Sequence, residues 1–156
     1  FNRGNGGRSF LFKVALADLM AYMHGTARRI ERIQLVEARL PRLAGVEAGF
    51  SGADFWPEAA SLVYTASVED TRDAYNDGKV LGSFVGIIAL RDLAAGRTLD
   101  LTRNGQLLVR SGRPIPTKIE SVALTHSGEQ RATGALVSDN DEGASEFFTL
   151  ELNIRP

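Results

Sequence analysis

Short apolar runs with β-strand character alternate along the chain with polar turns that contain glycine. The run Ser9–Val14 (SFLFKV) resembles Ser83–Ile88 (SFVGII), and each is followed by a related segment, ALADL at 15–19 and ALRDL at 89–93. These two copies lie 74 residues apart. A third copy, Gly143–Leu152, aligns with Gly7–Leu16 without a gap. A fixed long period of this kind indicates a repeat architecture.

A second repeated unit lies upstream of these runs. Gly45–Phe50 corresponds to Lys118–Ala123, and the glutamates Glu47 and Glu120 are 73 residues apart. Each copy is followed by a loop, a second apolar run (61–66 and 133–137), an acidic loop and a third run. Further strand-like stretches lie at 30–36 and in parts of 99–109. Each unit therefore predicts strand, turn, strand, acidic loop and strand, with a closing strand.

One segment has a different period. Residues 17–24 (ADLMAYMH) show helical spacing, and Gly25 stands where a helix ends. We expect one short helix inserted between two strands.

Four short strands per repeat predict an all-β fold, part of a β-propeller with about two and a half four-stranded blades. Residues 1–44 would form the outer strands of one blade, 45–117 a complete blade with its connection, and 118–156 the inner three strands of the last blade. Residues 1–156 would then be the C-terminal part of one propeller domain. We expect its partner to be the missing N-terminal part, in the same or a separate chain.

Composition excludes several classes of protein. The 156 residues carry a formal net charge of −1 and form no run of Lys or Arg, so we expect no nucleic-acid partner. No apolar run reaches membrane-spanning length, and we expect no membrane partner. The chain has no cysteine, which excludes disulfides and thiolate metal sites. The overall pattern favours a soluble protein, cytoplasmic rather than periplasmic.

Acidic residues recur where a propeller would gather them. Glu47 and Glu120 open the first strand of successive units, where side chains converge on a central channel, and Asp70 and Asp139 end the second strand. With Asn140, these oxygens could contribute to a ring of ligands for Ca²⁺. The alternative is structural: Asp, Asn and Gly suit tight turns, and the glutamates could brace neighbouring blades.

Two further residues are candidates for binding a small polar ligand. Trp56, beside Phe55 and before Pro57, is predicted in a loop between strands, where it could stack on a ligand or pack its own blade. Arg3 lies in the NRGN loop, at the position of the acidic loops. It could pair with the acidic side chains or bind an anionic ligand.

The stretches YTASVEDTRDAYNDGKVLGS (64–83), KIESVAL and VSDNDEGAS together resemble an uncharacterised bacterial family of β-propellers. More distantly they are similar to phytase-like and esterase-like propellers with a Glu-Gly motif before a Ser-Asp-Asn-Asp motif. The chain departs from that pattern, because Ala48 follows Glu47 and Ser121 follows Glu120. The resemblance implies a propeller of six blades and no established activity.

Three functions remain open at this stage. The first is a scaffold that binds a small polar ligand or a metal at the channel mouth. The second is a calcium-dependent hydrolase of an ester or phosphoester. The third is a propeller that binds another protein, which predicts a large exposed apolar patch. Fold alone does not decide among them.

Overall fold

A computed structural model describes residues 8–71, 78–94, 96–139 and 143–154 of the protein. It is an all-β structure with one α-helix, and its sheets are small and open over the described residues. This confirms the all-β class. The helix α1, Leu16–Met23, confirms the predicted helix, and Gly25 follows it with a positive φ of 72° that glycine adopts readily. No helix in the described part of the chain is long and apolar enough to cross a membrane.

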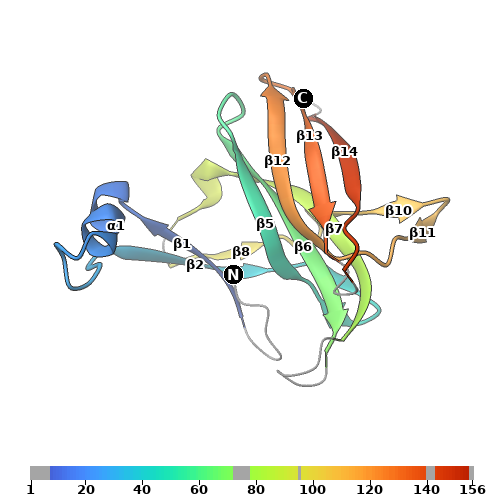
Figure 1. Cartoon of the computed structure of the whole chain (residues 1–156), viewed down its shortest axis with the longest axis horizontal. Helices are drawn as coiled ribbons and strands as arrows, with labels where there is room; N and C mark the ends of the chain where they lie inside the picture. Colours follow the sequence, from blue (N-terminus) through green and yellow to red (C-terminus); the bar gives the residue numbers. More distant parts are fainter. Residues whose placement is uncertain (1–7, 72–77, 95, 140–142, 155–156) are drawn as a thin grey trace.

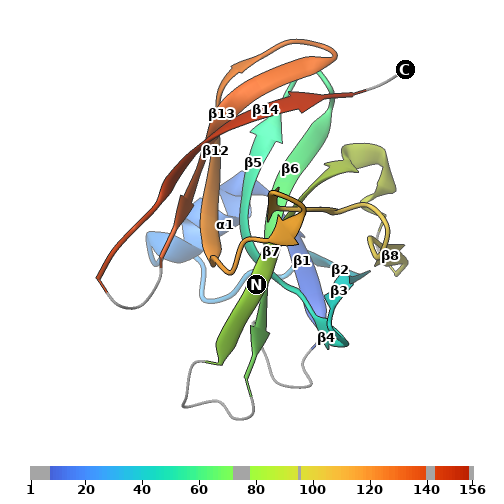
Figure 2. The same cartoon turned by 90° about the vertical axis from the view of Figure 1, so that its right-hand side faces the viewer.

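Three sheets contain most of the strands (Figures 1 and 2). The first sheet has the order β1-β2-β8, with β1 at Ser9–Val14, β2 at Ile33–Arg39 and β8 at Thr98–Asp100. The central sheet has the order β5-β6-β7-β9, formed by Gly49–Trp56, Ser61–Asp70, Lys79–Ala89 and Gln106–Leu107. The last sheet has the order β12-β13-β14, formed by Ile119–Ser127, Arg131–Ser138 and Phe147–Asn153.

Smaller elements connect these sheets. One hairpin pairs β3 (Arg42–Leu43) with β4 (Val46–Glu47), and another pairs β10 (Val109–Arg110) with β11 (Arg113–Pro114). A 3₁₀ turn, η1, covers Leu90–Asp92 after β7.

The last sheet has the predicted order of three consecutive antiparallel strands. In the central unit the first strand predicted at 45–50 is wrong: Val46–Glu47 forms β4 of a separate hairpin, and the sheet begins with β5 at Gly49–Trp56. The predicted closing strand within 99–109 is divided between two sheets. Its first part belongs to β8, which pairs in parallel with β2, and β9 pairs with β7 in the central sheet. Between them the buried Leu101 donates its amide to the carbonyl of Arg39 and fixes the crossing.

Two hydrophobic cores lie on opposite faces of the central sheet. The first core joins it to the first sheet through side chains such as Phe50, Tyr64 and Ile88 on one side and Ala38 on the other. The second core joins it to the last sheet. It contains Trp56, Val63, Val85, Ile119, Val122, Ala132 and Leu136. The central sheet is therefore apolar on both faces and sits between two neighbours.

Candidate functional site

Carboxylates gather at one end of the interface between the central and last sheets. This acidic rim consists of Glu69 and Asp70 at the end of β6, Glu120 near the start of β12, Asp139 after β13 and Glu146 before β14. Strand pairing brings the ends together, since Asp70 lies opposite Lys79 and Ile119 lies opposite Ser138. The strand ends concerned lie in the lower half of Figure 2.

A lysine is enclosed within this rim. The Lys118 side chain is only 6% exposed, and its Nζ lies 3.5 Å from Glu69 Oε1 and 3.6 Å from Glu120 Oε1. The Lys118 carbonyl also accepts the amide of Asp139 at 3.1 Å. A buried ammonium is costly unless carboxylates compensate it, so the rim holds this cation by charge.

Acidic side chains outnumber basic ones among the described residues of the rim. Its five carboxylates lie with two described ammonium groups, those of Lys118 and Lys79. The whole chain carries a formal net charge of only −1. Concentration of one sign of charge in this way attracts counter-ions of the opposite sign.

Two buried serine hydroxyls lie beside the backbone that precedes β12, next to the acidic rim. Ser67 Oγ lies 2.9 Å from Ser83 Oγ and donates to the carbonyl of Ile119 at 2.9 Å. Ser83 Oγ donates to the carbonyl of Thr117 at 2.7 Å and accepts the amide of Ile119 at 3.0 Å. Both serines are buried. These bonds fix the start of β12 against β6 and β7, and therefore fix the backbone on both sides of Lys118.

Two further features tighten the same region. Thr117 Oγ1 donates to Glu146 Oε2 at 3.1 Å, and the Glu146 amide donates to Ser138 Oγ at 3.1 Å. At Gly52 an added Cβ would lie 2.9 Å from the Cα of Ser121, so only glycine allows β5 and β12 to approach this closely. The rim is therefore built on ordered strand ends.

The structure brings part of the predicted site together. Asp70, Glu120 and Asp139 all belong to the acidic rim. Glu47 does not share the partners of Glu120: it lies on β4 and pairs with Arg42 across the hairpin, Nη2 to Oε2 at 3.2 Å. That hairpin packs on the first core through Leu43 and Val46, whereas Glu120 stands on the last sheet. Arg3 and Asn140 lie outside the described residues.

Trp56 occupies a different position from the one expected. It is the last residue of β5 and not part of a loop, and its side chain is 0% exposed in the second core. Its Nε1 donates to the carbonyl of Gly128 at 2.7 Å, in the turn that follows β12. The loop begins one residue later, at Pro57. The indole lies at the end of the sheet opposite the acidic rim and links the central and last sheets.

The residues predicted to bind Ca²⁺ are Glu47, Asp70, Glu120, Asp139 and Asn140. Calcium takes six to eight oxygen ligands. Over the described residues, no group of three or more His, Asp or Glu side chains is placed to hold a metal ion. Asp70, Glu120 and Asp139 share one end of the molecule without forming such a group, and Glu47 pairs with Arg42. Asn140 lies outside the described residues and other blades were expected to complete the ring, so the calcium site stays a prediction.

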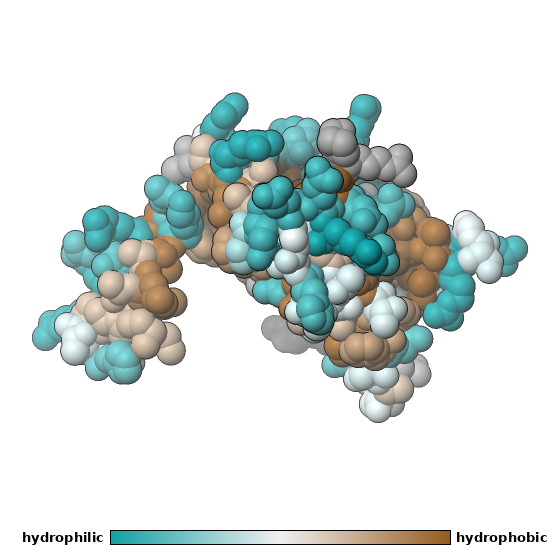
Figure 3. Space-filling model, turned by 90° about the horizontal axis from the view of Figure 1, so that it is seen from above, coloured by the Kyte–Doolittle hydropathy of each residue, from teal (hydrophilic) through white to brown (hydrophobic). Residues whose placement is uncertain are grey.

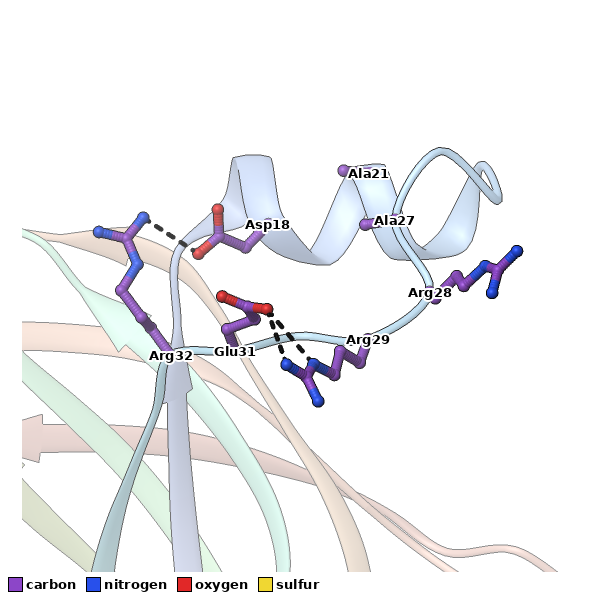
Figure 4. Close-up of a pocket in the computed structure, with 7 residues that line it drawn as sticks. All are labelled: Asp18, Ala21, Ala27, Arg28, Arg29, Glu31 and Arg32. Carbon is purple, nitrogen blue, oxygen red and sulfur yellow. Dashed lines mark hydrogen bonds and ion pairs between the residues drawn. The ribbon is translucent and has the colours of Figure 1, made fainter.

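A concave region lies beside α1, apart from the acidic rim (Figure 4). It has a volume of about 630 Å³ and is lined by Asp18, Ala21, Ala27, Arg28, Arg29, Glu31 and Arg32. Two of the three arginines are paired with acids. Arg29 Nη2 lies 3.1 Å from Glu31 Oε1, and Arg32 Nη2 lies 3.3 Å from Asp18 Oδ2. Arg28 extends away from these pairs. The net charge of this lining is small, because its two acidic side chains balance two of its three arginines.

Sequence reasoning did not single out Lys118 or Glu69. The available signal was a lysine placed immediately before a strand, in KIES, with an acidic residue two positions later. Glu69 ends an apolar run in VED, directly before the Asp70 that was selected. Their pairing depends on packing between two sheets, which a single sequence does not display.

A comparison with family models identifies the family of this chain. The model described as "Family of unknown function (DUF6929)" covers residues 1–152. No curated protein matches the chain, and no solved structure matches it. Since the match extends over nearly the entire sequence, the chain belongs to this family of unknown function, DUF6929.

Proposed function

We propose that the protein is a binding scaffold of the β-propeller type whose acidic rim takes a small organic cation, an amine or a guanidinium. The observation that carries this proposal is the enclosure of the Lys118 ammonium between Glu69 and Glu120. The rim accommodates the Lys118 ammonium between two carboxylates, so its chemistry suits a second cation of the same kind. The sequential sheets and the repeated sequence support the propeller part of the proposal.

The carboxylates of the acidic rim are hydrogen-bond acceptors of the kind that an organic cation needs. Ammonium and guanidinium groups donate several charge-assisted hydrogen bonds, and carboxylates accept them at short range. Of the two carboxylates beside Lys118, that of Glu120 is the more accessible, because its side chain is 31% exposed while that of Glu69 is 16% exposed. We therefore assign Glu120 the main contact with the ligand and Glu69 the task of holding Lys118.

The test is thermal unfolding with putrescine, guanidinium at low millimolar concentration, or Ca²⁺, each compared with NaCl at equal ionic strength. A ligand present at 100 times its Kd stabilises the native state by about 2.7 kcal/mol. We expect putrescine or guanidinium to raise Tm, and Glu120→Gln to abolish the increase. Glu151→Gln is the matched control, since Glu151 is an exposed carboxylate paired with Arg131 on the last sheet.

Two results would contradict the organic-cation proposal. One is an equal increase of Tm in both variants, which would indicate general screening of charge. The other is stabilisation by Ca²⁺ alone. If Ca²⁺ also supports hydrolysis of p-nitrophenyl phosphate or acetate, and EDTA and Glu120→Gln remove that activity, the phytase-like calcium-dependent hydrolase replaces the scaffold.

The third hypothesis, protein interaction, is favoured by a separate observation. Large apolar side chains are exposed on α1 and on the adjoining strands β1 and β2. They are Phe12, Leu16, Met20, Tyr22, Met23, Ile33 and Leu35. This surface lies on the first sheet and its helix, apart from the acidic rim.

A further inference from the structure

The first sheet has an uncovered apolar face. Its residues Leu11 and Ala38 pack in the first core, toward the central sheet, and Val36, the partner of Leu11, is buried. Side chains alternate along a strand, so the partners paired at the intervening positions point the other way. These pairs are Phe10 with Glu37, Phe12 with Leu35, and Val14 with Ile33. Most of this outer face is therefore apolar, and Phe12, Ile33 and Leu35 are exposed there.

The sequence repeat identifies the equivalent face on each sheet. Aligned as SFLFKV, SFVGII and the run after Gly143, the chain places Val14, Ile88 and Leu150 at equivalent positions. Ile88 packs in the first core, against the sheet that precedes the central sheet in the sequence. Leu150 packs on the second core, against the central sheet that precedes the last sheet. In both cases this position faces the preceding sheet.

Val14 occupies the position equivalent to Ile88 and Leu150, but no preceding sheet is present among the described residues to cover it. Phe10 supports the same relation, since its equivalent Phe84 is buried in the first core and faces the first sheet. By continuity with the two observed interfaces, the outer face of the first sheet is the one that a preceding sheet covers. The required partner presents aliphatic side chains, as Leu11 and Ala38 do toward the central sheet.

We propose that the outer face of the first sheet is an interface for a further β-sheet of the same repeat, carried on the same polypeptide ahead of β1. A second copy of this chain is a poorer match. The last sheet would have to supply its outer face, where Thr149, Glu151 and Arg131 alternate away from the core and Arg131 pairs with Glu151 at 3.2 Å. Pairing two first sheets would join identical faces, whereas both observed interfaces join different faces.

The surface view also shows exposed apolar side chains in the part of the molecule that carries the first sheet and α1. Figure 3 shows the lobe that carries α1 standing clear of the main body, with hydrophobic side chains gathered on it. Exposed apolar patches of this kind mark interaction surfaces in soluble proteins.

Cysteine labelling tests the proposal directly, because the chain has no cysteine of its own. Leu35→Cys places a single thiol on the outer face, and Val109→Cys is the matched control on the β10–β11 hairpin. The two side chains have similar exposure, 43% and 50%. We expect a maleimide to label Leu35→Cys at least about tenfold more slowly than Val109→Cys in the polypeptide expressed from the natural gene, since a covered site reacts only when it opens.

Ile33→Cys provides a second probe of the same face and carries the same expectation. Equal labelling of the outer-face and control thiols in a folded monomer would overturn the proposal. Protection that appears only as protein concentration rises would also overturn it, in favour of a second copy. The labelling uses no ligand, so its failure would leave the proposal of a cation at the acidic rim unaffected.

Discussion

The two faces of the central sheet are covered in different ways. Against the first sheet the contact is apolar, with Phe50 packed edge-on against Tyr64 at a ring separation of 5.4 Å. Among the described residues, no ion pair crosses this interface. Against the last sheet an apolar core is joined by polar contacts along its length, from Lys118 at the acidic rim, through Ser67 and Ser83, to Trp56 at the far end.

The two interfaces therefore contribute differently: the first mainly stabilises the fold, and the second also positions β12 relative to β6. Apolar burial is strong but has no direction, so the first interface supplies cohesion without fixing an exact register. Hydrogen bonds between buried groups have defined geometry and penalise displacement. A partly buried bond of this kind joins the Leu124 amide to the Asp54 carboxylate, which accepts it at 2.7 Å across the two sheets. The second interface therefore places β12 accurately beside β6, and the acidic rim depends on that placement.

The largest effect is expected at Trp56. Replacement by alanine removes the largest fully buried side chain and its bond to Gly128. We expect Trp56→Ala to lower the free energy of unfolding by about 3–5 kcal/mol, the usual cost of such a cavity. Urea unfolding followed by circular dichroism measures this, because the only tryptophan is lost.

Phe50→Ala is the comparison in the first interface. Phe50 is also buried, at 1% exposure, and its loss should cost a similar free energy while Trp56 keeps its native fluorescence. A loss below about 1 kcal/mol for Trp56→Ala would show that the second interface contributes little to stability.

A smaller effect is expected at Lys118. Lys118→Met leaves Glu69 and Glu120 without the ammonium between them, at the rim end of the second interface. We expect a loss of about 2 kcal/mol, between the values for exposed and fully buried ion pairs, because both carboxylates are partly exposed. Chemical denaturation at low salt measures the change.

A double variant separates charge from packing at this site. If the loss arises from an uncompensated carboxylate, Lys118→Met combined with Glu69→Gln should recover roughly half of it. Strictly additive losses would instead assign the effect to packing of the lysine stem. That result would remove the electrostatic support for a rim that binds cations.

Much of the fold was accessible from the sequence because its signals are local or periodic. The run Ser83–Ile88 and the spacing of 17–24 carry their own strand and helix patterns, and both elements form. The division of 99–109 between two sheets was not accessible. Whether β8 joins the first sheet depends on the burial of Leu101 and its bond to Arg39, which are tertiary events.

The candidate site was predicted less completely for the same reason. Asp70, Glu120 and Asp139 could be selected because they recur beside strands. The repeat suggested that Glu47 and Glu120 would have equivalent surroundings, but Arg42 lies close enough to pair with Glu47 within a tight hairpin. Trp56 looked like a loop residue beside Pro57, although an apolar ring with a partner for its N–H is more stable when buried.

The smallest effect at neutral pH is expected at Tyr64, in the first interface. Its hydroxyl is buried without a hydrogen-bond partner in the described part of the chain, and the absence of a side chain at Gly86 makes room for the ring. Tyr64→Phe removes an unsatisfied polar group, so we expect unfolding to become harder by up to about 1 kcal/mol. Burial raises the pKa of Tyr64 well above its ordinary value.

That pKa shift makes the effect depend on pH. The unfolded chain ionises this tyrosine near pH 10, while the folded protein keeps it neutral to higher pH. Its contribution to stability is therefore complete below about pH 10 and declines above it, by about 1.4 kcal/mol per pH unit. Urea unfolding at pH 7 and at pH 11 should show a smaller decline for Tyr64→Phe than for the unsubstituted protein. Tyr22→Phe, which alters a half-exposed tyrosine on α1, should decline as the unsubstituted protein does. Equal declines in all three would mean that the Tyr64 hydroxyl reaches water, and the first interface would then lack the closed apolar character that distinguishes it from the second.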